Sequence, residues 1–248
     1  MAAPITESEN KDVNLPRRHR LRATGRVLTA VLLGLLVLNF IPVMVMNPQI
    51  LPDAMRSQPF TEGFLNHTPM WLVSLVLILI ISKGKLAAYG FHVGKDYRIK
   101  QAIALGAGTG IAFALILNLF PEADAFQRDY TFLQTVVFVW LYASVSEEIL
   151  TRGLIQGFLT PLVRYGFSVL GVRISLPVLV SALFFGLMHL VVLTTGVAVL
   201  PVIGYVVFAS VLGFIAGYHR EKTGSLIPAI MVHMFGNIGG YCTGLLVG

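Results

Sequence analysis

The chain has few charged residues for its length. Asp, Glu, Lys and Arg make up 12% of its 248 residues, while apolar residues make up 56%. Soluble domains carry roughly 25% charged residues, so this scarcity of charge excludes an ordinary soluble domain. The composition indicates a polytopic membrane protein whose first partner is the lipid bilayer.

Cysteine is also scarce, because Cys242 is the only one. A single cysteine excludes an intramolecular disulfide and a cysteine-based metal site. The net charge is +6, but the basic residues stand in blocks beside apolar segments and are not interleaved with aromatic residues. We therefore expect no nucleic-acid partner, and the sequence leaves the oligomeric state open.

Long runs of apolar residues make up most of the sequence. A membrane-spanning helix needs about 20 mostly apolar residues, and seven segments meet this requirement. The predicted fold is an all-α polytopic transmembrane helix bundle of about seven or eight spans. The predicted spans are 27–46, a segment centred on 70–81, 101–120, 132–153, 176–193, 197–218 and 226–247. The segment 154–172 is interpreted as an interfacial or re-entrant helix, and it would be the eighth span if it crossed the membrane.

The predicted domain organisation is simple. Residues 1–26 form a polar, basic tail, and residues 27–248 form a single membrane domain. The span 101–120 is rich in Gly and Ala, which favours close contact with another helix. Basic residues gather before 27 and in the loops 82–100, 154–175 and 219–225, so the positive-inside rule predicts a cytoplasmic N-terminus and an outside C-terminus. The absence of organelle retention motifs favours a bacterial inner membrane.

A few polar residues stand inside the predicted spans. Ionisable groups within a membrane are candidates for a functional site in the bundle interior. Those found here are Glu147, Glu148, Arg152, His189, His233 and Asn237. Taken span by span, these residues also fit structural roles. The charged residues of 132–153 could form a solvated cluster at a helix end, and the histidines and the asparagine could form hydrogen bonds between helices.

Helix geometry separates the two glutamates. Glu148 and Arg152 are i, i+4 neighbours on one helix face, so they can neutralise each other. Glu147 is rotated by about 100° from Glu148 and is left to face a cavity.

Counting along the helices predicts the depth of the site. At about 1.5 Å per residue, Glu147 lies roughly 9 Å from residue 153 and His233 roughly 10 Å from residue 226. His189 lies roughly 20 Å from residue 176, which is deeper. The count predicts a cytosol-facing intramembrane cavity in the inner half of the bilayer.

This set of side chains is typical of hydrolysis. A glutamate can act as the general base on a water molecule, with the histidines orienting that water or stabilising an oxyanion. Zinc sites often use two histidines and one carboxylate, which gives Glu147, His189 and His233 as metal-ligand candidates. The HExxH motif of soluble zinc proteases is absent, so both a zinc-dependent and a metal-free mechanism stay open.

Three strings along the chain resemble a known family. EEILTR matches the pattern EExxxR, FGLMH matches FxxxH, and HMFGN matches HxxxN/D, in that order on successive predicted spans. They resemble the CPBP family of intramembrane peptidases, also called the Abi or CAAX-protease family, over a catalytic core of about 132–247. The family is usually labelled a metalloprotease, although a metal-independent glutamate mechanism is also argued.

The resemblance implies roles for the matched residues. Glu147 would be the water-activating base, Glu148 the second carboxylate, and Arg152 the residue that holds the pair. The remaining motif residues would orient the water, bind the oxyanion or pack beside the site: His189, His233, Asn237 and Phe185. The substrate would be a membrane-embedded or membrane-adjacent protein or peptide, including a lipidated one. The alternatives are a catalytically inactive scaffold or regulator of a sensor protein and, as a third class, an ion or proton transporter.

Overall fold

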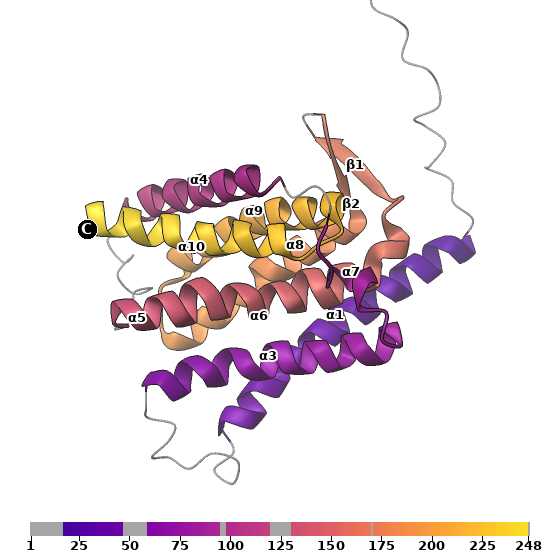
Figure 1. Ribbon diagram of the computed structural model, residues 1–248, viewed down its shortest axis with the longest axis horizontal. Coiled ribbons are helices and arrows are strands. Elements are labelled where there is room, and N and C mark those ends of the chain that lie inside the picture. The colour runs from indigo at the N-terminus through magenta and orange to yellow at the C-terminus, as the bar shows by residue number, and fades with distance from the viewer. Residues whose placement is uncertain (1–16, 47–58, 95–97, 120–129, 170, 248) are drawn as a thin grey trace, which may run out of the picture.

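The computed structural model describes residues 17–46, 59–94, 98–119, 130–169 and 171–247. Seven helices in these ranges are long and apolar enough to cross a membrane, which confirms the predicted helical bundle (Figure 1). The candidate spans are Arg18–Phe40, Gly63–Ser82, Ile99–Leu117, Phe132–Leu162, Leu176–Thr194, Val199–Thr223 and Ile227–Val247.

The first three spans lie in α1 (Arg17–Met46), α3 (Pro59–Ser82) and α4 (Ile99–Leu117), with a short 3₁₀ turn η2 (Leu86–Tyr89) after α3. Helix α1 begins at Arg17, so the last part of the predicted basic tail 1–26 is helical. The rest of that tail, residues 1–16, lies outside the described residues.

The fourth helix runs without interruption from Phe132 to Leu162. It is composed of α5 (Phe132–Gln134), the π-helical η4 (Thr135–Ala143), α6 (Ser144–Glu148), the π-helical η5 (Ile149–Ile155), α7 (Gln156–Leu159) and η6 (Thr160–Leu162). The predicted end at 153 was wrong, because Leu154, Ile155 and Leu159 are fully buried and continue the packing of the helix against its neighbours.

The remainder of the segment 154–172 is not the helix that the sequence predicts. Strands β1 (Gly166–Val169) and β2 (Val172–Ser175) form an antiparallel hairpin, with Gly166 opposite Ser175 and Val169 opposite Val172. β-Branched residues favour strands, and Gly171 adopts a φ of 78°, which a tight hairpin turn requires. In the described part of the chain an eighth span is therefore not found.

The last three spans follow the hairpin. They lie in α8 (Leu176–Met188) with its 3₁₀ continuation η7 (His189–Thr195), α9 (Val199–Thr223) and α10 (Ile227–Val247). Ser175 caps α8 by accepting a hydrogen bond from the backbone N–H of Val178. The predicted spans 176–193, 197–218 and 226–247 agree with these helices to within a few residues.

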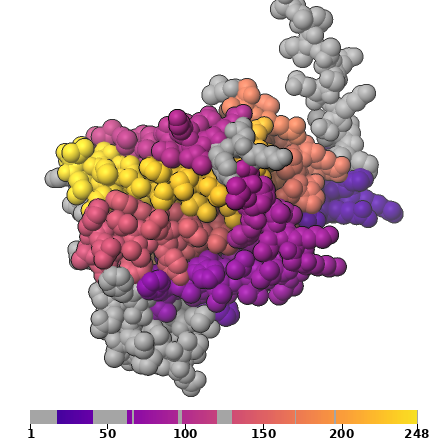
Figure 2. Space-filling model, in the orientation of Figure 1, coloured from indigo at the N-terminus to yellow at the C-terminus, as the bar shows by residue number. Residues whose placement is uncertain are grey.

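Two apolar clusters flank the fourth helix. Helices α1 and α3 pack with it around Leu150, Leu154 and Ile78, whereas α4, α9 and α10 pack around Leu212 and Val232. Figure 2 shows α4, α10 and the fourth helix side by side on one face of the molecule. The inner sides of the fourth helix, α8, α9 and α10 therefore meet in the middle of the bundle.

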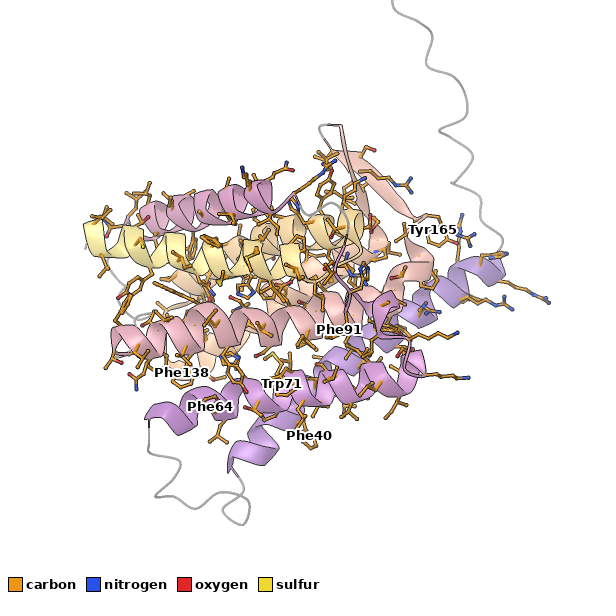
Figure 3. All side chains as sticks on the ribbon, in the orientation of Figure 1. Phe40, Phe64, Trp71, Phe91, Phe138 and Tyr165 are labelled. Atoms are coloured by element: carbon orange, nitrogen blue, oxygen red, sulfur yellow. The ribbon has the colours of Figure 1, made fainter. Side chains whose placement is uncertain are left out.

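Aromatic residues join α3 to the first half of the fourth helix. Phe64 and Phe138 pack edge to face with ring centroids 5.2 Å apart, and Trp71 Nε1 donates a 2.9 Å hydrogen bond to the Tyr142 hydroxyl (Figure 3). Edge-to-face pairs fix the relative position of two elements in addition to burying area. This contact holds the start of the fourth helix against α3.

Helices α4 and α10 approach each other through glycine, as the Gly- and Ala-rich span predicts. A Cβ atom added to Gly106 would lie 2.3 Å from the carbonyl oxygen of Val232, and one added to Gly110 would lie 2.0 Å from that of Gly236. Only glycine permits backbones to come this close. The contact fixes the part of α10 that carries His233 and Asn237.

The two ends of the bundle differ in charge. Arg26 Nε donates to the Phe158 carbonyl over 2.8 Å, and Arg220 Nη2 donates to the Ala88 carbonyl over 3.1 Å. The Ser175 hydroxyl donates to the Glu221 carboxylate. These contacts join the start of α1, the turn η2, the hairpin and the α9–α10 turn into what we call the basic end. The far end holds the start of the fourth helix and the C-terminal ends of α4 and α10, where Asn118 Nδ2 donates to the Val247 carbonyl over 3.4 Å (Figure 1).

Candidate active site

Glu147 and Glu148 lie near the middle of the fourth helix, between its two π-helical segments. Glu147 is 8% exposed and Glu148 is fully buried. π-Helical turns are rare and are often found at functional sites, because the widened turn redirects side chains. The two carboxylates are thus presented to the bundle interior by an irregular stretch of helix that the sequence did not predict.

Glu148 is held in an ion pair. Arg152 Nη1 donates to Glu148 Oε1 over 2.7 Å, and both side chains are fully buried, as the i, i+4 spacing predicts. The same Arg152 nitrogen lies 2.7 Å from Thr151 Oγ1, and the guanidinium stacks 4.6 Å from the centroid of the Phe185 ring. A buried carboxylate needs such a partner to remain charged.

His233 connects the two carboxylates. Its Nδ1 lies 3.1 Å from Glu148 Oε1, and its Nε2 lies 3.9 Å from Glu147 Oε2. With Glu148 ionised, Nδ1 is the donor, so Nε2 of the neutral ring is an acceptor. This tautomer follows from the hydrogen-bond network.

His189 approaches the same carboxylate oxygen from α8. Its Nδ1 donates to the Phe185 carbonyl over 2.7 Å, and its Nε2 lies 3.9 Å from Glu147 Oε2. The Nε2 atoms of His189 and His233 therefore converge on Glu147, while their Nδ1 atoms are held by other groups. Phe185 packs edge to face with both rings, at centroid distances of 5.1 Å.

Asn237 lies one turn after His233 on α10 and contacts the fourth helix. Its Nδ2 donates to the Val139 carbonyl over 3.0 Å and to Ser144 Oγ over 3.3 Å. These two bonds use both hydrogens of the amide nitrogen. The side chain thus ties α10 to the first π-helical segment.

A cavity with a volume of ≈ 70 Å³ lies beside Glu147. This volume accommodates a few water molecules. The lining combines the candidate residues with apolar and aromatic side chains: Val139, Ala143, Glu147, Phe185, His189, Tyr205, Phe208, Ala209, Leu212, His233 and Asn237. Glu148 and Arg152 lie behind this wall and do not line the cavity.

The depth count needs correction. The fourth helix ends at Leu162, so Glu147 lies roughly 20 Å from that end, not roughly 9 Å. His189 lies at a similar distance along α8. Helix α10 begins deeper in the bundle, where the backbone N–H of Leu226 donates to the Gly90 carbonyl over 3.0 Å, and this offset brings His233 level with Glu147.

Sequence reasoning did not assign several residues in or beside the cavity to the site. The Tyr205 ring packs edge to face with His189 at a centroid distance of 4.9 Å, and Phe208 and Leu212 form the wall beside it. Thr151 is fully buried, and its Oγ1 donates to the Glu147 carbonyl over 2.6 Å. Apolar and aromatic residues are common everywhere in a membrane span, so nothing in their spacing distinguishes these positions.

The donor types of Glu147, His189 and His233 are those of a zinc site, but their spacing is not. Among the described residues no three metal-ligating side chains are grouped so that they could hold an ion. As placed, the three side chains do not fit a metal.

Comparison with known proteins adds an independent finding. Residues 129–239 match the family described as Rce1-like, type II CAAX prenyl endopeptidase. No curated protein and no solved structure gives a significant match. The matched segment contains all three motifs and the whole site around Glu147. Residues 129–239 therefore belong to the CAAX protease, or CPBP, family of membrane peptidases.

Proposed function

We propose that the protein is an intramembrane endopeptidase in which Glu147 activates a water molecule. The observation that carries this proposal is the convergence of His189 Nε2 and His233 Nε2 on Glu147 Oε2, at 3.9 Å each, on the wall of a cavity. The match to a peptidase family supports the class of reaction.

The three converging atoms are all acceptors when both rings are neutral, so the group between them must be a donor. A water molecule meets this requirement and is held by Glu147 and a histidine. Glu147 takes one proton from the water, and the water oxygen attacks the carbonyl carbon of the scissile peptide. The proton then passes from Glu147 to the leaving nitrogen as the C–N bond breaks.

Charge balance supports a role for the histidines in this reaction. Glu147, Glu148 and Arg152 sum to one negative charge when both rings are neutral, so the buried site can accept one more proton. That proton is the one taken from the water: Glu147 shares it with a histidine Nε2, where it stabilises the oxyanion of the tetrahedral intermediate, and it then returns through Glu147 to the leaving nitrogen. Glu148 and Arg152 hold His233 in place and do not touch the substrate.

Asn237 acts as a positioning residue in this proposal. Both hydrogens of its amide nitrogen are directed at the fourth helix, so neither is free for an oxyanion. Its bond to Val139 holds the first π-helical segment against α10, which keeps Glu147 opposite His233.

The test is cleavage of a fluorogenic membrane peptide by the full-length protein in lipid vesicles. We expect Glu147→Gln to lower the rate by about 10²- to 10⁴-fold, because the amide cannot accept the proton. Glu221→Gln is the matched control, since Glu221 lies at the basic end and its bond to Ser175 survives as an amide. Cleavage at the normal rate by Glu147→Gln would contradict the proposal.

Zinc dependence is tested on the same preparation. We expect cleavage to survive dialysis against a chelator, because the reaction as written uses no metal. Elemental analysis of the purified wild type and of Glu147→Gln provides a readout that does not depend on activity. Stoichiometric zinc in the wild type that is lost in Glu147→Gln would show that Glu147, His189 and His233 hold a metal.

A further inference from the structure

The β1–β2 hairpin has one apolar face and one polar face. Side chains alternate between the two faces of a strand, and residues opposite each other in a strand pair share a face. The other face of the pair that holds Ser168 and Arg173 is apolar throughout. The register groups four side chains on this apolar face of the hairpin: Phe167, Ile174, Val169 and Val172.

The apolar face of the hairpin is about half exposed. Phe167 is 48% exposed, and Val169 and Val172 are 44% and 46% exposed. Within the described ranges none of the four residues belongs to the two apolar clusters of the bundle. A two-stranded hairpin is at best marginally stable in water unless it packs against another surface. The apolar face therefore requires an occupant.

The chain holds the hairpin close to the ends of two spans. Residues 163–165 are all that separate the fourth helix from β1, and α8 begins directly after β2. In Figure 1 the two strands run across the direction of the spans, at the basic end of the bundle. The hairpin therefore lies along the surface of the membrane and does not project from it.

The dimensions of the hairpin fit the interfacial layer of a bilayer. This layer of headgroups is about 5–8 Å thick on each side of the membrane. A strand of four residues is about 13 Å long. A hairpin standing upright would leave the layer, whereas one that lies along the surface stays within it and can turn its apolar face to the acyl chains.

Arginine and tyrosine side chains accompany the hairpin. Arg173 Nη2 donates to the Arg164 carbonyl over 2.7 Å, and Arg164 Nη2 donates to the Tyr165 hydroxyl over 2.8 Å. Both arginine side chains are exposed, so their charges are available to an anionic headgroup. Tyrosine is enriched at the level of the headgroups in membrane proteins.

The basic residues also identify the leaflet. Arg26, Arg220 and Lys222 lie at the same end of the bundle as the hairpin. Cytoplasmic loops carry the excess of Lys and Arg in membrane proteins, so the basic end is the cytoplasmic one. The cytoplasmic leaflet carries anionic lipids, whose negative potential attracts basic segments.

We propose that the hairpin docks on the anionic cytoplasmic leaflet, with its apolar face on the acyl chains and Arg164 and Arg173 among the headgroup phosphates. For 154–172 the sequence predicts an interfacial or re-entrant helix; docking keeps the interfacial position for a pair of strands. Because the hairpin joins the fourth helix to α8, docking holds the ends of the helices that carry Glu147 and His189. The proposal does not depend on the cleavage chemistry.

Quenching by lipid measures whether the apolar face meets the bilayer. Cys242 is the only cysteine and is exposed, so Cys242→Ala provides the background. An environment-sensitive fluorophore is attached at Val169→Cys or Val172→Cys on the apolar face. The adjacent Ser168→Cys, on the polar face, is the matched control. The full-length protein is placed in vesicles of phosphatidylcholine and phosphatidylglycerol that contain phospholipids spin-labelled on the acyl chain.

We expect blue-shifted emission and strong quenching at Val169→Cys and Val172→Cys, and weak quenching at Ser168→Cys. Equal quenching on the two faces, or no quenching on either, would overturn the proposal. Blue-shifted emission at Val169→Cys without quenching by lipid would show that protein, such as a second copy of the chain, covers the face, and this too would overturn it.

The role of the arginines is tested with the double variant Arg164→Gln and Arg173→Gln, using the Val169→Cys reporter. In vesicles with phosphatidylglycerol, we expect the ratio of docked to undocked hairpin to fall by about fivefold for each arginine removed. In phosphatidylcholine alone the double variant should match the unmodified hairpin. An equal loss in both kinds of vesicle would show that the arginines act only within the protein, and would overturn docking on an anionic surface.

Discussion

Glu147 and Glu148 are neighbours in the chain with the same side chain and different surroundings. Glu148 is bound by Arg152 and His233, whereas Glu147 Oε2 faces two histidine nitrogens at 3.9 Å and has no hydrogen bond among the described residues. Two carboxylates in different environments can take different roles in one reaction. The rotation of about 100° between adjacent helical residues is sufficient to separate them.

The position of Arg152 depends on a glycine of another helix. A Cβ atom added to Gly213 would lie 2.8 Å from Arg152 Nη2 and 3.1 Å from Ala182 Cα. The guanidinium cannot easily move, because Glu148, Thr151 and the Phe185 ring contact it on other sides. We therefore expect Gly213→Ala to lower stability by about 1–3 kcal/mol, as over-packing does, and to reduce cleavage.

The matched control is Gly204→Ala on the same helix. A methyl group at Gly204 meets nothing within 4 Å, so this variant should be as stable as the wild type or more stable by roughly 0.5–1 kcal/mol. Thermal unfolding in detergent micelles and the cleavage rate are measured for both variants. Equal behaviour of the two would show that Arg152 does not need the space above Gly213.

At the scale of elements, the fourth helix is shaped by polar side chains that satisfy its own carbonyl groups. The Ser146 hydroxyl donates to the Tyr142 carbonyl, and Thr151 Oγ1 donates to the Glu147 carbonyl over 2.6 Å. Asn237 supplies a third such bond from α10, to Val139. Unpaired carbonyl groups are costly in an apolar environment, so these bonds allow the helix to widen around the site.

Disrupting the contact between α4 and α10 should displace the site residues that α10 carries. Gly236 lies between His233 and Asn237, and a Cβ atom at Gly110 would lie 2.0 Å from the Gly236 carbonyl oxygen. We expect Gly110→Ala to push the helices apart, to cost at least about 1–3 kcal/mol of stability and to reduce cleavage.

Gly108→Ala separates this effect from any general cost of alanine in α4. A methyl group at Gly108 meets nothing within 4 Å. Gly108→Ala should keep the wild-type cleavage rate and an unfolding temperature equal to or above that of the wild type. A Gly110→Ala protein with wild-type stability would contradict the close approach of the two backbones.

For the whole molecule, the seven candidate spans found among the described residues predict that the two termini lie on opposite sides of the membrane. With the basic end in the cytoplasm, a fluorescent protein fused to the N-terminus should be fluorescent, and alkaline phosphatase fused to the C-terminus should be active outside. The exchanged fusions serve as controls: alkaline phosphatase at the N-terminus should be inactive, and the fluorescent protein at the C-terminus should not be fluorescent. Phosphatase that is inactive at the C-terminus would indicate an even number of spans.

The sequence by itself determined the spans, the Glu148–Arg152 pair and the close glycine contact of 101–120. Each depends on local properties, namely the length of an apolar run, the i, i+4 spacing of a helix and the small size of glycine. It also named the polar residues of the cavity wall, Glu147, His189, His233 and Asn237, although their catalytic roles stay a prediction and most of the apolar wall was missed.

Only the tertiary structure decided where the fourth helix ends, which oxygen the histidines face and which side chains line the cavity. The contact between His233 and Glu148 joins residues 85 positions apart, and no periodicity encodes the offset of one helix along another. That offset is set by packing and backbone contacts such as Leu226 to Gly90. Helix-end counting failed here because the helices of this bundle do not begin at a common level.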